Sequence, residues 1–119
     1  MGAHNEFGKL GEEMATEYLI NKGYGIQYRN YRYQKAEIDI IARKGTILAV
    51  VEVKSRSSDH LQEIAETVNK KKMGLLVSAA DHYVTEKGLD VDVRFDIITI
   101  LKVGQDFEIN HLEDAFYHF

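Results

Sequence analysis

The sequence contains no cysteine, no proline and no tryptophan among its 119 residues. Without cysteine, neither a disulfide framework nor a thiolate zinc site can form. No apolar run approaches the roughly 20 residues that a membrane-spanning helix needs, and no charged and then apolar leader with a cleavage site is visible. We therefore expect a cytoplasmic protein without a membrane segment. Its 45% hydrophobic residues suit the core of one domain over residues 1–119.

The chain also lacks the overall positive charge of proteins that coat nucleic acid, because its formal net charge is -4. The charge is unevenly distributed. Residues 29–72 carry ten Lys and Arg against six Asp and Glu, whereas residues 1–28 and 73–119 have net charges of -2 and -6. Basic charge is therefore concentrated around the centre of the chain.

Apolar periodicity predicts a mixed α/β sheet flanked by helices. Helices are expected over residues 5–22 and from 61 to about 86, with a break near Asn69. Strands are expected over residues 24–34, on both sides of a turn at 43–46, and over 91–103, with a polar loop at 55–60. Residues 104–119 form a variable tail with a short strand at 106–109, and its aromatic residues are expected to dock on the domain or on a partner.

Charged residues interrupt the two central strands, which lie within residues 37–56 (EIDIIARKGTILAVVEVKSR). Asp39 interrupts the first strand, while Glu52 and Lys54, two residues apart, share one face of the second. An Asp on one strand and Glu-x-Lys on the next can bind Mg²⁺, with the Val53 backbone carbonyl as a further ligand. Lys54 would orient a metal-bound water or stabilise the charge that develops on a phosphate. A cross-strand ion pair explains the same residues and stays open as the alternative.

Several other charged residues are candidates for the same site. Glu12 borders the apolar stripe of the first helix and is slightly favoured over Glu13 to face inward. Lys72 occupies the stripe of the second helix, so it is aimed toward the sheet, although the lysine run 70–72 also suits a solvated helix start.

Other charged residues lie in or near the predicted strands. Arg29 and Arg32 alternate with tyrosines that can stack on bases; alternatively, the tyrosines pack and the arginines face solvent. Arg94 and Asp96 share a face of the last predicted strand, and we expect them to pair.

Five segments together resemble the small bacterial YraN-like family. They are G-E-x-x-A-x-x-Y-L (residues 11–19), N-Y-R (30–32), E-I-D-I-I-A (37–42), V-E-V-K-S-R (51–56) and R-F-D (94–96). That family is assigned to the PD-(D/E)XK, or restriction-endonuclease-like, nuclease superfamily and is similar to archaeal Holliday junction resolvases. The resemblance runs from about Gly8 to Ile100 in matching order. It implies an αβββαβ core and a Mg²⁺- or Mn²⁺-dependent endonuclease that cuts DNA, with branched or damaged DNA as the expected substrate.

The resemblance also implies roles for individual residues. Asp39 matches the first acid of the superfamily motif, and Glu52 and Lys54 match its (D/E)XK element. Glu12 matches a helical acid that joins the metal site in resolvase-like members, and Glu37 is expected to support the metal ligands without touching the metal. Arg29, Arg32, Arg56 and Lys72 are the expected phosphate contacts. Ile38 replaces the proline of the superfamily name, which is usual in this family.

Two other classes of function remain open. One is a non-cleaving DNA-binding or adaptor module that keeps the nuclease fold. The other is a structural protein that assembles through its aromatic tail. Because small nucleases that cut two strands commonly pair as symmetric dimers, we also expect a homodimer.

Overall fold

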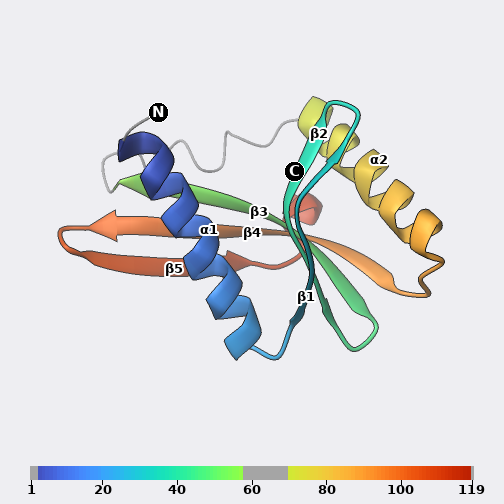
Figure 1. The fold of residues 1–119 in the computed structure, drawn as a ribbon, viewed down its shortest axis with the longest axis horizontal. Coiled ribbons are helices and arrows are strands. Elements are labelled where there is room, and N and C mark those ends of the chain that lie inside the picture. The colour runs from blue at the N-terminus through green and yellow to red at the C-terminus, as the bar shows by residue number, and fades with distance from the viewer. Residues whose placement is uncertain (1–2, 58–69, 119) are drawn as a thin grey trace.

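The computed structural model describes residues 3–57 and 70–118 and confirms the predicted order of helix, three strands, helix and strand (Figure 1). The helices are α1 (Ala3–Asn21) and α2 (Lys70–Lys87). The strands are β1 (Gly25–Tyr33), β2 (Ala36–Lys44), β3 (Ile47–Ser57), β4 (Asp92–Val103) and β5 (Asp106–Leu112), followed by the 3-10 helix η2 (Ala115–His118). Within these described ranges, no helix is long and apolar enough to span a membrane.

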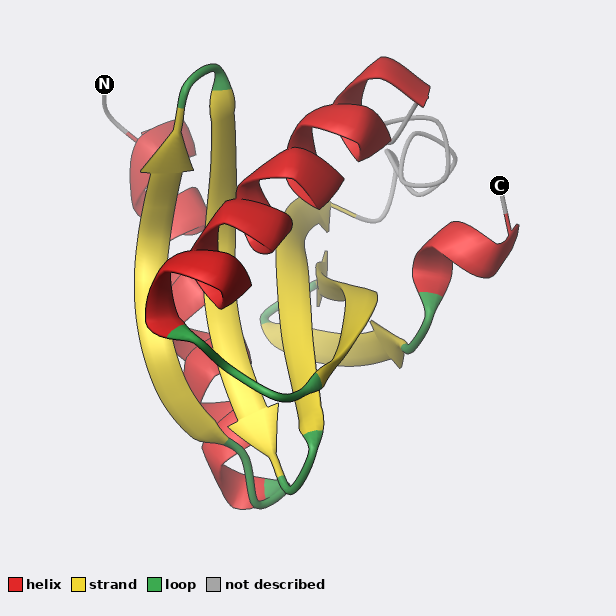
Figure 2. Cartoon of the chain, turned by 90° about the vertical axis from the view of Figure 1, so that its right-hand side faces the viewer, coloured by secondary structure: helices red, strands yellow, loops and turns green. Residues whose placement is uncertain are grey.

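The five strands form one mixed sheet in the order β1-β2-β3-β4-β5. Neighbouring strands run antiparallel except β3 and β4, which are parallel. A parallel pair needs a long crossover connection, and α2 lies in the connection from β3 to β4. Figure 2 shows α2 in front of the sheet and α1 behind it. The predicted mixed sheet flanked by helices is therefore confirmed, and it is compatible with a restriction-endonuclease-like core.

The sheet separates two buried apolar layers. The layer on the α1 side contains Ala15, Leu19, Tyr24, Ile40, Ala42, Ala49, Val51, Ile98 and Ile100. The layer on the α2 side contains Ala36, Ile38, Ile41, Leu48, Val50, Leu76, Ala79, Ala80 and Tyr83. Side chains alternate between faces along a strand, so the residues of β3 that follow Val50 at even positions also point to the α2 side. These residues are Glu52 and Lys54.

The predicted turn between the central strands is confirmed. Lys44 ends β2 and Ile47 begins β3, which leaves a two-residue connection of Gly45 and Thr46. Gly45 has a φ of 61°, a left-handed conformation that glycine adopts without steric cost. The turn places residue 44 opposite residue 47 and so sets the register of the whole hairpin.

The expectation of a polar loop at residues 55–60 is wrong for its first part, because β3 continues through Ser57. Ser55, Arg56 and Ser57 pair in parallel with Ile100, Leu101 and Lys102 of β4. A polar sequence can remain in a strand when a distant strand supplies its backbone partners, and local sequence does not report that pairing. Residues 58–69, which include the predicted break near Asn69, lie outside the described part of the chain.

The C-terminal segment is attached to the sheet through β5 and η2. The predicted short strand at 106–109 extends to Leu112 and pairs along β4. Ala115 is fully buried, and the Phe116 ring stacks on Phe95 with 4.7 Å between centroids. Docking of the tail aromatics is thus observed for Phe116.

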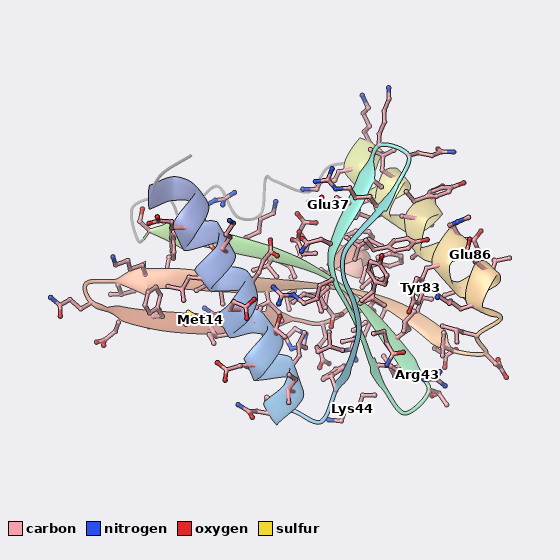
Figure 3. All side chains as sticks on the ribbon, viewed as in Figure 1. Met14, Glu37, Arg43, Lys44, Tyr83 and Glu86 are labelled. Carbon is pink, nitrogen blue, oxygen red and sulfur yellow. The ribbon has the colours of Figure 1, made fainter. Side chains whose placement is uncertain are left out.

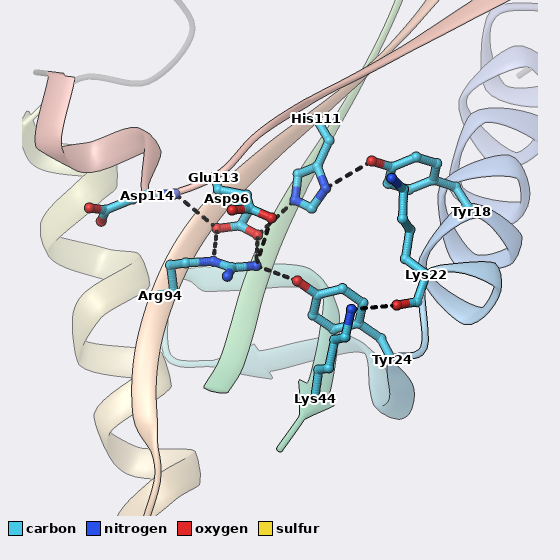
Figure 4. Close-up of polar contacts among 9 residues, drawn as sticks. All are labelled: Tyr18, Lys22, Tyr24, Lys44, Arg94, Asp96, His111, Glu113 and Asp114. Carbon is cyan, nitrogen blue, oxygen red and sulfur yellow. Dashed lines mark hydrogen bonds and ion pairs between the residues drawn. The ribbon is translucent and has the colours of Figure 1, made fainter. Parts of the chain in front are cut away.

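A buried carboxylate connects β4 to the elements around it (Figure 4). The expected pair is present: Arg94 donates from Nε and Nη2 to the two oxygens of Asp96, at 2.9 and 2.8 Å. His111 Nε2 lies 2.8 Å from Asp96, and the backbone N–H of Asp114 donates to it at 3.1 Å. Burial alone would raise the pKa of Asp96, but these hydrogen bonds hold it below its usual range.

We expect Asp96→Asn to destabilise the protein by about 3 kcal/mol in urea unfolding at pH 7, because Arg94 would keep a partly buried charge without its partner. The matched control is Asp92→Asn on an exposed position of β4, with an expected effect below about 0.5 kcal/mol. Because the folded pKa of Asp96 is depressed, its contribution is present above about pH 4 and is lost as the pH falls further. Equal stability of the two variants at pH 7 would contradict this assignment.

Candidate functional site

The candidate site begins where β2 and β3 separate. Their antiparallel pairing ends at Ile40 and Val51. In Figure 1, β3 then continues beside β4 while β2 turns away with β1. We call this opening the β2–β3 fork. The backbone N–H of Val53 donates to Asp39 Oδ2 at 2.8 Å, so a side chain supplies the acceptor at the point where the strands part.

Glu52 and Lys54 lie next to the fork on β3 and are both largely buried, with exposed fractions of 8% and 9%. Lys54 Nζ lies 3.0 Å from Glu52 Oε1. Lys72 Nζ reaches the same oxygen from the first turn of α2, at 2.8 Å. Lys72 therefore faces the sheet as predicted, whereas Lys70 and Lys71 are exposed.

Glu12 approaches the fork from the opposite face, on α1. It is half-buried, whereas Glu13 is exposed and pairs with Arg29 at 2.7 Å, which confirms the preference for Glu12 as the inward-facing acid. Close packing of α1 on β3 makes this approach feasible: a Cβ on Gly11 would lie 1.9 Å from Ser55 Oγ. A glycine at this position allows the helix to come near enough to place Glu12 beside the strands.

These acids line one cavity of about 210 Å³ at the fork. Its lining residues are Phe7, Gly8, Glu12, Asp39, Glu52, Val53, Ser55 and Arg56. A larger hollow of about 350 Å³ lies between α1 and β5, beside Met14 (Figure 3), but its lining is mostly apolar. We place the site at the smaller cavity because polar groups converge there, and polar groups rather than volume determine what chemistry a cavity can do.

Burial in the cavity raises the pKa of two acids, Asp39 and Glu12. Burial, with a further contribution from Glu52, raises the pKa of Asp39 to about 7, although the Val53 N–H opposes this change. Burial also raises the pKa of Glu12, while Arg29 lowers it. Negative charge is therefore costly here, and a cation in the cavity would relieve that cost.

The oxygen atoms at the fork can hold a hard divalent cation. Glu52 Oε2 is buried and accepts no hydrogen bond, so it has unused acceptor capacity. A residue's N–H and C=O point to the same side of a strand, so the Val53 carbonyl also faces the fork. In residues 3–57 and 70–118, no three His, Asp or Glu side chains are close enough to form a ready metal cluster. Asp39, Glu52 and Val53 line the cavity and can offer these oxygens, and Glu12 lines the same cavity.

The remaining predicted residues lie at different distances from this cavity. Arg56 lines it and donates from Nη1 to the Ser55 carbonyl at 2.9 Å. Arg29 forms ion pairs with Glu13, at 2.7 Å, and with Glu12, at 3.8 Å.

Arg32 and Glu37 form an ion pair of 2.6 Å on the exposed end of the β1–β2 hairpin, where Figure 3 labels Glu37. The structure therefore brings Arg56 and Lys72 to the acids but places Arg32 and Glu37 at the edge.

Sequence reasoning did not identify Phe7, Gly8 and Ser55 as lining residues. Gly8 and Gly11 lie three positions apart in the first predicted helix, where glycine is unfavourable. Of the two, Gly11 was the signal of close packing, because a Cβ there would meet Ser55, whereas a Cβ on Gly8 would meet nothing within 4 Å.

We expect Asp39→Asn to be more stable than the wild type in metal-free buffer at pH 8. The amide keeps an acceptor for the Val53 N–H, and the variant avoids placing a negative charge beside Glu52. Because the folded pKa of about 7 lies above the unfolded value, ionisation destabilises the folded protein as the pH rises from about 4 to 7. At about 1.4 kcal/mol per pKa unit, the gain at pH 8 has a ceiling of about 4 kcal/mol. Urea unfolding at pH 5 and 8 tests this, and a gain that does not grow with pH would contradict it.

Comparison with known proteins identifies relatives of this chain. Residues 11–100, which include Glu12, Asp39, Glu52 and Lys54, match the model of a family described as "Uncharacterised protein family UPF0102". The chain is 50% identical over 119 residues to a UPF0102 protein of Flavobacterium psychrophilum, with full coverage of both chains. It is 44% identical to a UPF0102 protein of Phocaeicola vulgatus, over 98% of this chain and 97% of the relative. The chain therefore belongs to the UPF0102 family.

Proposed function

We propose that this protein is a metal-dependent endonuclease that hydrolyses phosphodiester bonds in DNA. The observation that carries the proposal is the cavity at the β2–β3 fork, which Asp39, Glu52 and Glu12 line, with Lys54 Nζ 3.0 Å from Glu52. Two carboxylates next to an ammonium group suit a reaction that needs a bound divalent cation and a stabilised phosphate charge. The resemblance to PD-(D/E)XK nucleases in these same residues supports this choice over other hydrolytic reactions.

In this proposal, Asp39, Glu52 and the Val53 carbonyl hold Mg²⁺ or Mn²⁺, and Glu12 contributes directly or through a water. When bound, the ion would polarise the phosphodiester and lower the pKa of a coordinated water. The fit rests on the unused Glu52 Oε2 and on the raised pKa of Asp39, both of which indicate room for positive charge.

Lys54 is the group that we assign to proton handling. Burial lowers the pKa of Lys54, as does the neighbouring Lys72, while Glu52 opposes the change. A lysine that releases its proton more readily can orient a water and accept a proton from it, and in its charged form it stabilises a developing phosphate charge. The short contact to Glu52 keeps its amine beside a residue that lines the cavity.

The charge distribution limits how DNA can be bound. The net charge of -4 disfavours a long non-specific footprint, whereas the basic central region can meet phosphates close to the acids. Arg56 and Lys72 are the best placed contacts, and we propose a structured DNA, branched or damaged, as the substrate. A homodimer would present two such sites, one for each strand.

Cleavage of a labelled DNA panel tests the proposed activity. The panel contains duplex, single strand, flap and four-way junction, each with Mg²⁺ or Mn²⁺. We expect cutting of one structure, and Lys54→Ala should reduce its rate by at least about 100-fold, the usual size of an acid–base or electrostatic contribution. Lys87→Ala, at an exposed position of α2, is the charge-matched control. If wild type binds DNA independently of metal and cuts nothing, the non-cleaving adaptor function is favoured.

We expect Arg56→Ala to weaken DNA binding and to reduce the slope of log affinity against log salt by about 0.9, the value for one lost phosphate contact. Arg32→Ala should have a smaller effect, because Arg32 lies at the sheet edge and is paired with Glu37. Fluorescence anisotropy between 50 and about 200 mM salt measures both slopes. An unchanged slope for Arg56→Ala would remove this residue from the proposed DNA contact.

A further inference from the structure

Two ammonium groups contact the same carboxylate oxygen at the fork. Glu52 Oε1 lies 2.8 Å from Lys72 Nζ and 3.0 Å from Lys54 Nζ, while Oε2 of the same group is buried without a hydrogen bond. Both ammonium groups contact the carboxylate that a divalent cation would have to bind. They therefore compete with the cation for Glu52.

The two lysines differ in how they reach Glu52. Lys54 comes from the same strand, and its side chain is 11% exposed, so its position follows from β3 itself. Lys72 comes from the first turn of α2, and its side chain is 35% exposed. Lys72 therefore reaches Glu52 from another element and has more access to solvent than Lys54.

We propose that Lys72 is a positioning residue that neutralises Glu52 in the metal-free protein and is displaced from it by the divalent cation. This inference rests on the proposed function. The displaced ammonium group stays near Glu52 on its half-exposed side chain, where it would contact a substrate phosphate. Metal binding and DNA binding are therefore coupled positively through Lys72. The metal releases Lys72 from Glu52 so that it can contact a phosphate, and a phosphate that binds Lys72 leaves Glu52 available to the metal.

Isothermal titration with Mg²⁺ and Mn²⁺ tests the competition. We expect Lys72→Met to bind the ion roughly 10-fold more tightly than the wild type, within the ~5–150-fold range of coupling between linked sites. Lys72→Arg keeps the charge and should stay near wild type. Lys71→Met removes the same charge from the neighbouring, exposed position and should also have little effect. Equal or weaker binding by Lys72→Met overturns the inference.

Thermal unfolding separates this role from a purely structural one. Without metal, Lys72→Met should unfold at a lower temperature than wild type, because Glu52 loses a partner. Saturating Mg²⁺ should close most of that difference, since the ion replaces the lysine. If Lys72→Met lowers the unfolding temperature equally with and without Mg²⁺, Lys72 supports only the fold and the inference is overturned.

A measurement on the wild type covers the case in which Lys72→Met does not fold. Lysine side-chain NMR signals, assigned with Lys72→Arg, should show the Lys72 signal shifting as Mg²⁺ saturates the protein; an unmoved signal would overturn displacement. Asp39→Ala/Glu52→Ala serves as the variant without metal ligands. If wild type binds no more ion than this double variant, the proposed function fails and the inference with it. If wild type binds and Lys72→Met binds no more tightly, the inference alone fails.

Discussion

The hydrogen bond from the Val53 N–H to Asp39 is the contact on which the arrangement of the site depends. Backbone pairing between β2 and β3 ends at Ile40 and Val51, and a buried donor beyond that point needs an acceptor. Asp39 supplies it and thereby lets β3 leave β2 and continue along β4. The cavity opens in the space between the two strands. A single carboxylate thus satisfies the sheet and brings an acid to the position where the proposed chemistry needs one.

The acids at the fork are stabilised in different ways. Asp39 is held by an uncharged backbone donor, and burial raises its pKa to about 7. Glu52 is held by two ammonium groups on one oxygen. Ionisation of Asp39 therefore destabilises the folded protein, whereas two lysines compensate the charge of Glu52. Placing unfavourable charge at a functional site is a known trade of stability for activity. Here the cost is confined to the fork, because apolar layers on both faces of the sheet support the strands around it.

Much of the fold could be predicted because its signals are local. Gly45 marks the central turn, and apolar spacing marks both helices and the strands that follow them. The alternation of side chains was enough to place Glu52 and Lys54 together. The end of β3 could not be predicted, because residues 55–57 are polar and are held in the strand by β4, about 45 positions further along the chain. The ion pair of Arg29 could not be predicted either, because its partner Glu13 lies on a different element.

The sequence by itself determined which charged groups interrupt the central strands and that Glu52 and Lys54 share one face of β3, because side chains two positions apart on a regular strand point to the same side. The tertiary structure decided which groups meet. It brought Glu12 from α1 to the cavity and Lys72 from α2 to Glu52, and it left Arg32 and Glu37 paired at the sheet edge. Such contacts depend on how closely a helix approaches a strand and on where a ladder of hydrogen bonds ends. Both follow from packing between distant segments, which no local pattern of residues records.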